Sequence, residues 1–425
     1  MYKVCVSKKT DTYSVSQVAD IFSVSKETVR RWDKVGKLVP TRQKGNRYRV
    51  YSENQLRLFD EGNVFFQQGI VDNRVEPVRP FSLVELFAGA GGLALGLEKA
   101  GLKSVLVNEI DRDACKTLRA NRPAWNIVES SISEVDFKPY RGKVDILTGG
   151  FPCQAFSYAG KKLGFEDTRG TLFFEYARAV KETRPAMIVA ENVRGLLKHE
   201  NGRTLQTMLS VIRDLGYEPI EPRVLKALHH RVPQKRERLI LVAFRKDVAP
   251  LVTFRWPAPT GKIYTLRDAL KKGELFPKSV PKSEGQKYPE SKRTVMELVP
   301  PGGYWRDLPV DIQKSYMMRS YYLGGGKTGM ARRMSWDEPC LTLTCAPAQK
   351  QTERCHPDET RPFTTREYAR IQTFPDEWNF CGSQSSIYKQ IGNAVPVNLA
   401  EQLGYSLVDA MNQISNRQAQ GAKAV

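Results

Sequence analysis

The stretch of sequence that decides the fold runs from Val144 to Gln154 and reads Val-Asp-Ile-Leu-Thr-Gly-Gly-Phe-Pro-Cys-Gln. Its apolar first half is typical of a strand inside a parallel sheet, because such strands are buried on both faces. Two glycines and a proline then turn the chain. Cys153 follows at the carboxyl end of the strand, where open α/β sheets present reactive groups. We therefore expect an α/β fold with a nucleophilic cysteine at the edge of its sheet.

Apolar strands and helical stretches alternate on both sides of this segment. Besides 144–148, strands are expected at 82–87, 104–109, 186–190 and 239–244, and helices at 92–100, 112–120, 170–183 and 203–214. This alternation predicts a Rossmann-like parallel sheet with helices on both faces. The rhythm stops after residue 271 and returns at 364–371 and 396–410. We expect a first catalytic part over 81–271, a smaller irregular domain over 272–360 and a returning catalytic segment over 361–425.

Residues 1–60 are predicted to form a separate module. Ser14–Phe22 and Lys26–Trp32 have the caps and apolar spacing of two short helices around a tight turn, and 45–51 fits a basic wing strand. The segment resembles the helix-turn-helix head of MerR-type regulators, with a small helical docking domain as the alternative. The resemblance implies that this module binds DNA. The candidate contacts are Arg30, Arg31, Arg47 and Arg49.

The composition favours a polyanionic partner. Lysine and arginine total 66 against 46 acidic residues, a formal net charge of +20, which suits nucleic acid. No apolar run approaches the ~18 residues that a membrane span needs, and the start lacks a signal segment, so we expect a cytoplasmic protein without membrane contact. Seven scattered cysteines argue against a disulfide framework. Cys340, Cys345, Cys355 and His356 fit no common zinc spacing, so we expect free thiols and no metal.

Two further segments supply chemistry that complements a cysteine. Glu191 and Asn192 follow the strand at 186–190, and Arg236 and Arg238 lie just before the strand at 239–244. Read singly, each is more often a strand end or a solvated charge. As an ordered set with Cys153, and with the segments 166–173 and 361–375, they resemble the DNA (cytosine-5) methyltransferases throughout the catalytic region.

The resemblance implies a mechanism. The Cys153 thiolate would attack C6 of a cytosine flipped out of double-stranded DNA, and C5 would then take the methyl group. Glu191 would hydrogen-bond or protonate N3, while Arg238, with Arg236 beside it, would hold O2. Asn192 is expected to shape the loop rather than react. An ordered water is expected to remove the C5 proton.

A glycine-rich turn after the first strand, 87–92, suits a nucleotide-like cofactor, and Glu109 follows about twenty residues later. That spacing alone fits either a nicotinamide dinucleotide or S-adenosylmethionine; the resemblance implies S-adenosylmethionine. Ser131 stands where the family usually has an acidic residue for the adenine. The expected cofactor-binding residues are Phe87, Gly89, Gly91, Gly92, Glu109, Ile110, Ser131, Ile132, Pro152, Leu172 and Asn393.

The segment 272–360 occupies the place of the family's target-recognition domain, and 342–344 (Thr-Leu-Thr) matches a short family feature there. Glycines at 324–326 invite a phosphate-loop interpretation, which fails because Tyr321 stands where the pattern needs glycine. They better suit a loop that approaches DNA, where arginine can read guanine edges. Candidate contacts are Lys327, Arg332 and Arg333.

The role of the N-terminal module stays open at this point. Residues 61–80, with two glycines and two prolines, are expected to be a linker. A module behind a linker need not lie near the active site, which favours regulation of its own operon through an operator over a simple gain in DNA affinity. A restriction endonuclease could be a cognate partner outside any stable complex, and a monomer is expected. The alternatives are a DNA-binding regulator with a methyltransferase-like scaffold, and an RNA methyltransferase, whose Cys-Phe-Thr signature is absent here.

Overall fold

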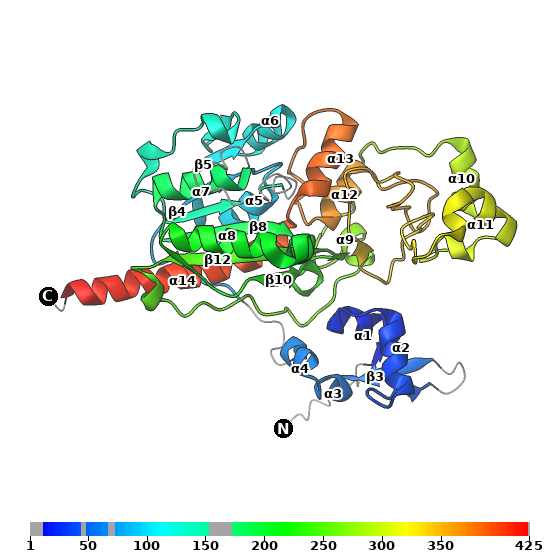
Figure 1. Cartoon of the computed structure of the whole chain (residues 1–425). Helices are drawn as coiled ribbons and strands as arrows, with labels where there is room; N and C mark the ends of the chain where they lie inside the picture. The colour runs from blue at the N-terminus through cyan, green and yellow to red at the C-terminus, as the bar shows by residue number, and fades with distance from the viewer. Residues whose placement is uncertain (1–11, 44–47, 67–72, 153–171, 424–425) are drawn as a thin grey trace, which may run out of the picture.

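The computed structural model of the chain describes residues 12–43, 48–66, 73–152 and 172–423 (Figure 1). Its central feature is an eight-stranded sheet with the order β10-β12-β8-β7-β4-β5-β6, in which β9 also pairs with β12. The α/β fold class is confirmed. The strands are β4 (Phe81–Leu86), β5 (Leu102–Glu109), β6 (Ile127–Glu129), β7 (Ile146–Gly149), β8 (Met187–Val193), β9 (Tyr217–Pro219), β10 (Arg223–Lys226) and β12 (Glu237–Arg245).

The prediction of a wholly parallel sheet is wrong at one edge. Strands β4 to β8 are parallel, but β12 runs antiparallel to β8, with Arg238 opposite Val193 and Phe244 opposite Met187. An apolar run shows that a strand is buried and carries no information about its direction. The segment between β10 and β12 is too short for a helical crossover, which takes a dozen or more residues, so the chain reverses.

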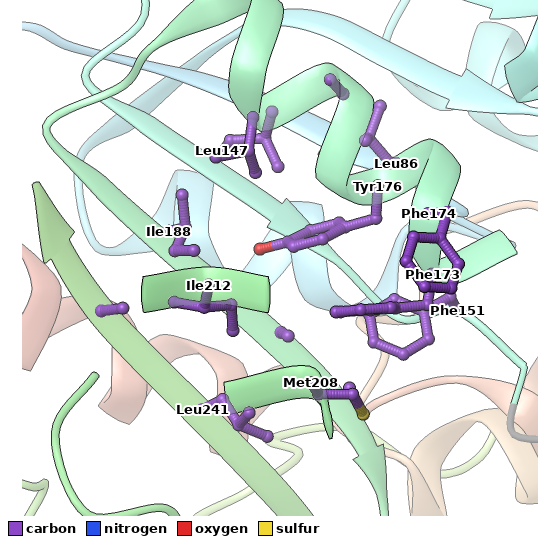
Figure 2. Close-up of a cluster of buried hydrophobic side chains, with 14 of the residues drawn as sticks. Leu86, Leu147, Phe151, Phe173, Phe174, Tyr176, Ile188, Met208, Ile212 and Leu241 are labelled. Atoms are coloured by element: carbon purple, nitrogen blue, oxygen red, sulfur yellow. The ribbon is translucent and has the colours of Figure 1, made fainter. Parts of the chain in front are cut away.

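Helices cover both faces of the sheet, as predicted. Side chains of β4 alternate between two cores: Val84 and Leu86 join one, and Phe81 and Leu83 join the other. The first core packs under α7 (Leu172–Thr183) and α8 (Arg203–Asp214), and Figure 2 shows its aromatic end around Phe151. The second packs under α5 (Gly92–Lys99) and α14 (Val397–Lys423). Helix α6 (Arg112–Asn121) follows β5.

The remaining elements form a third core and a small domain. The third core gathers α9 (Leu266–Leu270), α12 (Thr365–Ile371) and α13 (Gln384–Asn393) beside a short parallel pair, β11 (Gln234–Lys235) and β13 (Cys340–Leu341). The small domain has its own core, which includes Met296, Trp305 and Met317 and lies around α10 (Glu290–Glu297) and α11 (Val310–Met317). In the described parts of the chain, no helix is both long and apolar enough for a membrane span.

The N-terminal module contains the predicted helix-turn-helix. Its helices α1 (Val15–Phe22) and α2 (Lys26–Lys34) begin at the N-caps Ser14 and Ser25. A small sheet of order β1-β3-β2 accompanies them. Its strands and the following helices are β1 (Thr12–Ser14), β2 (Thr41–Arg42), β3 (Arg49–Ser52), α3 (Glu53–Leu56) and α4 (Asp60–Phe66).

Two expectations about this module are wrong. Residues 61–66 are not linker: they lie in α4, whose Phe65 and Phe66 are buried in the module's core. Gly62 is there for close packing, since a Cβ at this position would collide with the carbonyl oxygen of Leu56. The module is also not independent of the catalytic part, because Asp20 pairs with Lys235 across the boundary. Figure 1 shows α1 facing the body below α9 and β10.

A carboxyl group lies in the middle of the sheet. Glu85 of β4 is 1% exposed; one of its carboxyl oxygens accepts the Ala94 amide, and the carboxyl group also interacts with the Thr148 side chain. Burial raises the pKa of Glu85 to about 8. The group is therefore protonated at neutral pH in the folded protein, and ionised in the unfolded chain.

This difference makes stability depend on pH. Between an ordinary pKa near 4.5 and about 8, only the folded state holds the Glu85 proton, so the free energy of unfolding falls as pH rises, by up to about 1.4 kcal/mol per pH unit. Glu85→Gln removes this component, so its stability relative to the parent should improve from about pH 5 to pH 8 in urea denaturation. As a control, Glu134→Gln, at an exposed position, should keep the parent's dependence of the free energy of unfolding on pH. An unchanged slope in Glu85→Gln would contradict the prediction.

Candidate active site

A cavity of about 850 Å³ opens at the carboxyl ends of β4, β5, β7 and β8. It lies where open α/β sheets bind their ligands. The structure brings together at this cavity most of the predicted site residues, from eight separate segments. They are Phe87, Gly89, Gly92, Glu109, Ile110, Ser131, Ile132, Pro152, Leu172, Glu191, Arg236, Arg238 and Asn393. Cys153 lies outside the described residues, directly after the lining residue Pro152.

Glu191 and Arg238 form an ion pair in the cavity wall. The Arg238 Nε and Glu191 Oε1 atoms are 2.6 Å apart, and both side chains are largely buried. The pair exists because β12 runs antiparallel to β8, which makes the two residues diagonal neighbours on one face. Burial raises the pKa of Glu191, and the charges of Arg238 and Arg236 partly offset this. Gly150 completes the arrangement, since a Cβ there would lie 2.8 Å from Glu191 Oε2.

Arg236 holds the wall of the cavity from behind. Its guanidinium donates to the carbonyl oxygens of Leu343 (3.1 Å), Gly392 (2.8 Å) and Asn393 (3.2 Å). It is 2% exposed, and burial lowers its pKa to about 9, so it stays charged at neutral pH. Both terminal nitrogens of Arg236 are bound to backbone, and its buried Nε has no hydrogen-bond partner among the described residues, so a contact between Arg236 and the reacting base stays a prediction.

The segment that leads into Cys153 is anchored on both sides. Phe151 is 2% exposed, and its ring packs against Phe173 and Tyr176 at centroid distances of 5.4 and 5.5 Å (Figure 2). Asn192 donates from Nδ2 to the Phe151 carbonyl oxygen at 2.9 Å. This contact agrees with the expectation that Asn192 shapes the loop. A large aromatic side chain and a buried amide thus fix the backbone two residues before the cysteine.

The turn after β4 forms the other end of the cavity. Glu109 accepts the backbone N–H of Gly89 (2.6 Å) through one carboxylate oxygen and those of Ile110 and Asp111 through the other. A Cβ on Gly89 would meet nothing within 4 Å, so this turn faces open space. Phe87 adopts a left-handed backbone conformation (φ +59°), a strained geometry that non-glycine residues keep mainly at functional sites.

The other two glycines of the turn are required by packing, although Gly92 also lines the cavity. A Cβ on Gly91 would lie 2.7 Å from the Leu118 side chain, and one on Gly92 would lie 2.3 Å from the Val395 carbonyl oxygen. Gly91 does not line the cavity. The expectation that every glycine of this turn makes room for the cofactor is therefore corrected for Gly91, and the constraint on Gly92 comes from its neighbour in the fold.

Several lining residues were not predicted from the sequence, Glu85 and Cys345 among them. Glu85 reaches the cavity from inside β4, and an acidic residue within an otherwise apolar strand was the available signal. Cys345 is exposed, and its Sγ donates to Asn393 Oδ1 at 3.0 Å. No local pattern marks Cys345, because the two segments are 48 residues apart in sequence and meet only in the fold.

The predicted DNA contacts fall into two groups. In the module, Arg30 and Arg31 are exposed on α2, Arg49 pairs with Asp33 at 2.6 Å, and Arg47 lies outside the described residues.

In the small domain, Lys327 donates to the carbonyl oxygens of Ser320 and Leu323, and Arg332 is half-buried. The prediction that Arg333 contacts DNA is wrong. It is 4% exposed, and its guanidinium donates to the carbonyl oxygens of Met296 and Val299 at 2.6 and 2.7 Å. The burial of Arg333 could not be predicted from the sequence, because a basic residue beside glycines is typical of an exposed loop.

Comparison with known proteins identifies the family. The model for C-5 cytosine-specific DNA methylases matches residues 81–409, and that for MerR helix-turn-helix regulatory proteins matches residues 13–70. The chain is 65% identical over 407 residues to the Type II methyltransferase M.Eco47II of Escherichia coli, covering 96% of this chain and 98% of that protein. It is 59% identical over 401 residues to the Type II methyltransferase M.PspPI of Psychrobacter sp., covering 94% and 96%.

A solved structure agrees at the level of the fold. A proposed DNA modification methyltransferase encoded within an E. coli prophage aligns with a TM-score of 0.55 at 22% identity, covering 78% of this chain and 99% of that one. The family match spans every strand of the central sheet and all the lining segments of the cavity. The chain therefore belongs to the C-5 cytosine-specific DNA methylases and is a DNA (cytosine-5) methyltransferase with a MerR-type helix-turn-helix region at its N-terminus.

Proposed function

We propose that this methyltransferase modifies a cytosine that is flipped out of a short specific sequence in double-stranded DNA, through a covalent bond between Cys153 and C6. The observation that carries the proposal is the buried Glu191–Arg238 pair at 2.6 Å, in the same cavity wall as Phe151 and Pro152. A duplex cytosine cannot enter such a cavity while it is stacked, which is why flipping is required.

The cofactor end of the cavity fits S-adenosylmethionine. Phe87 offers an aromatic face for the adenine, Glu109 a carboxylate for the ribose hydroxyls, and Gly89 an open approach to the backbone. Asn393 would help to close the site, while Ser131 offers a hydroxyl rather than a carboxylate. S-adenosylmethionine, when bound, supplies an electrophilic methyl group for C5.

The residues of the chain supply the activation of the base. The Cys153 thiolate bonds to C6, the C5–C6 double bond opens, and electron density moves toward N3 and O2. Glu191, whose pKa burial raises, would hydrogen-bond to N3 or give it a proton, and Arg238 offers charge-assisted hydrogen bonds to O2. After methylation, a water takes the C5 proton, N3 returns to Glu191 any proton it received, the C5–C6 double bond reforms and the thiolate leaves C6. Arginine charge beside Cys153 would also favour the thiolate form of its side chain over the thiol.

The proposed role of Glu191 as a proton donor to N3 leads to a testable prediction. Glu191→Gln keeps a neutral hydrogen-bond donor but has no proton to transfer, so kcat should fall by roughly a hundredfold or more. Because burial raises the pKa of Glu191, the parent should lose rate on the alkaline side as this proton is lost. This loss of rate at alkaline pH should be absent when the single-turnover rate of Glu191→Gln is measured against pH. Identical profiles in both proteins would refute the assignment.

The nucleophile and the target can be tested together. Bisulfite sequencing of DNA from cells that express the parent should find protected cytosines in one short sequence context. Cys153→Ala should leave none, because the ring is then not activated. Protection that persists in Cys153→Ala would exclude the covalent route. A parent that is soluble but protects no DNA would favour an RNA substrate or a binding role.

The two DNA-facing parts have different proposed roles. The small domain, with Lys327 and Arg332, is proposed to read the target, as part of a restriction-modification system with a separate endonuclease. The N-terminal module is proposed to bind an operator and repress its own operon. Arg30 and Arg31 support this role, since both are exposed on the second helix of the helix-turn-helix, the element that enters the major groove in such motifs.

Operator binding should be separable from methylation at these arginines. Arg30→Ala with Arg31→Ala should abolish the shift of a DNA fragment from upstream of the gene in a gel assay, because the helix loses two of its exposed positive charges. Methylation of a target oligonucleotide should stay at the parent level. An equal loss of both activities would overturn the regulatory role and point to a single DNA surface.

A further inference from the structure

The N-terminal module is attached to the catalytic part by two ion pairs. Asp20 of α1, 6% exposed, lies 2.7 Å from the Nζ atom of Lys235. Glu338 accepts Lys26 Nζ of α2 at 2.5 Å and Ser16 Oγ of α1 at 3.0 Å. Both helices of the helix-turn-helix therefore take part, and the two pairs have opposite polarity across the boundary, which fixes the docked orientation.

Apolar and aromatic contacts extend the same boundary. The ring of Phe65 lies edge-on to that of His229 with centroids 5.6 Å apart, and Ile263 packs against the core of the module. His229 also faces the backbone oxygen of Asp20 at 3.4 Å. The interface is thus continuous from the ion pairs to the module's own core.

The residues that receive the module lie on the strand pair behind the active site. Lys235 ends β11, and Glu338 lies two residues before β13 begins at Cys340. The two strands pair in parallel, with Lys235 opposite Leu341, and Thr342 Oγ1 donates to the Lys235 carbonyl oxygen. The module therefore holds both members of this pair, one through each ion pair.

Each strand of the pair continues directly into the cavity wall. β11 is followed by Arg236, which donates hydrogen bonds to the carbonyl oxygens of Gly392 and Asn393. β13 is followed by Thr342, the first of the lining residues 342–345. Successive side chains of a strand point to opposite sides, so Lys235 meets the module while Arg236 supports the cavity.

We propose that the helix-turn-helix module is a working part of the methyltransferase, and that Asp20 and Glu338 are positioning residues that hold β11 and β13, and through them Arg236 and the cavity wall, in the catalytic geometry. The inference rests on the proposed active site and is independent of operator binding. It assigns the module a second role, in which it supports methylation by contacts on the side of α1 and α2 that faces the body.

The test uses the full chain and single-turnover methyl transfer at saturating S-adenosylmethionine and target DNA, per titrated active site. Asp20→Asn and Glu338→Gln should each lower the rate about tenfold, because a small displacement of the wall misplaces reacting groups. The exchange Asp20→Lys with Lys235→Asp should restore most of the rate, since it rebuilds the pair with reversed polarity. Glu53→Gln, which breaks the Glu53–Arg57 pair inside the module, should leave the rate unchanged.

Thermal unfolding separates positioning from stability. A merely structural interface would lower the melting temperature and leave the rate per folded active site at the parent value. Parent-like rates in both Asp20→Asn and Glu338→Gln, or a loss that the exchange does not restore or that Glu53→Gln shares, would overturn the proposal. A parent without methylation activity would instead refute the proposed function, so the two failures are distinguishable.

Discussion

The antiparallel pairing of β12 with β8 is the constraint on which the active site depends. In a parallel sheet, the beginning of one strand and the end of its neighbour lie at opposite edges. The reversal of β12 brings its first residues to the carboxyl end of β8, so that Arg238 meets Glu191 at 2.6 Å. The ligand edge of the sheet thereby gains a guanidinium next to a carboxyl group, deep enough for burial to raise the pKa of Glu191.

The same reversal organises what lies behind the site. The residues just before β12 form β11, and its pairing with β13 connects the sheet to the segment that lines the far wall. Arg236, at the junction, donates from its two terminal nitrogens to three backbone carbonyl oxygens, while its buried Nε has no hydrogen-bond partner among the described residues. These charge-assisted hydrogen bonds offset part of the free energy that burial of the guanidinium costs. The N-terminal module adds the outermost support, through Lys235.

Charge is divided among three tasks in this strongly basic chain. Some arginines, such as Arg30 and Arg31, are exposed and suit a polyanion. Others, such as Arg236 and Arg333, are buried and bind backbone carbonyls. Arg238 belongs to neither group, because it faces a carboxyl group in the cavity. Net charge indicates a nucleic-acid partner, but burial decides which side chains are available to it.

Local signals in the sequence were enough to predict five of the eight strands of the central sheet, the glycine turn, the Pro-Cys segment and the helix-turn-helix, because caps, apolar periodicity and turn residues are local. The short strands β6, β9 and β10 were not predicted. The sequence also pointed to Glu109 through its spacing from the glycine turn, and to Glu191 and Arg238 through resemblance to a family, and all three line the cavity. Only the tertiary structure decided the direction of β12, the packing role of Gly92, the burial of Arg333 and the helix that replaces part of the linker. The docking of the module through Asp20 and Glu338 is likewise visible only in the tertiary structure. Each of these depends on residues far apart in the chain, and no local pattern records which distant groups become neighbours.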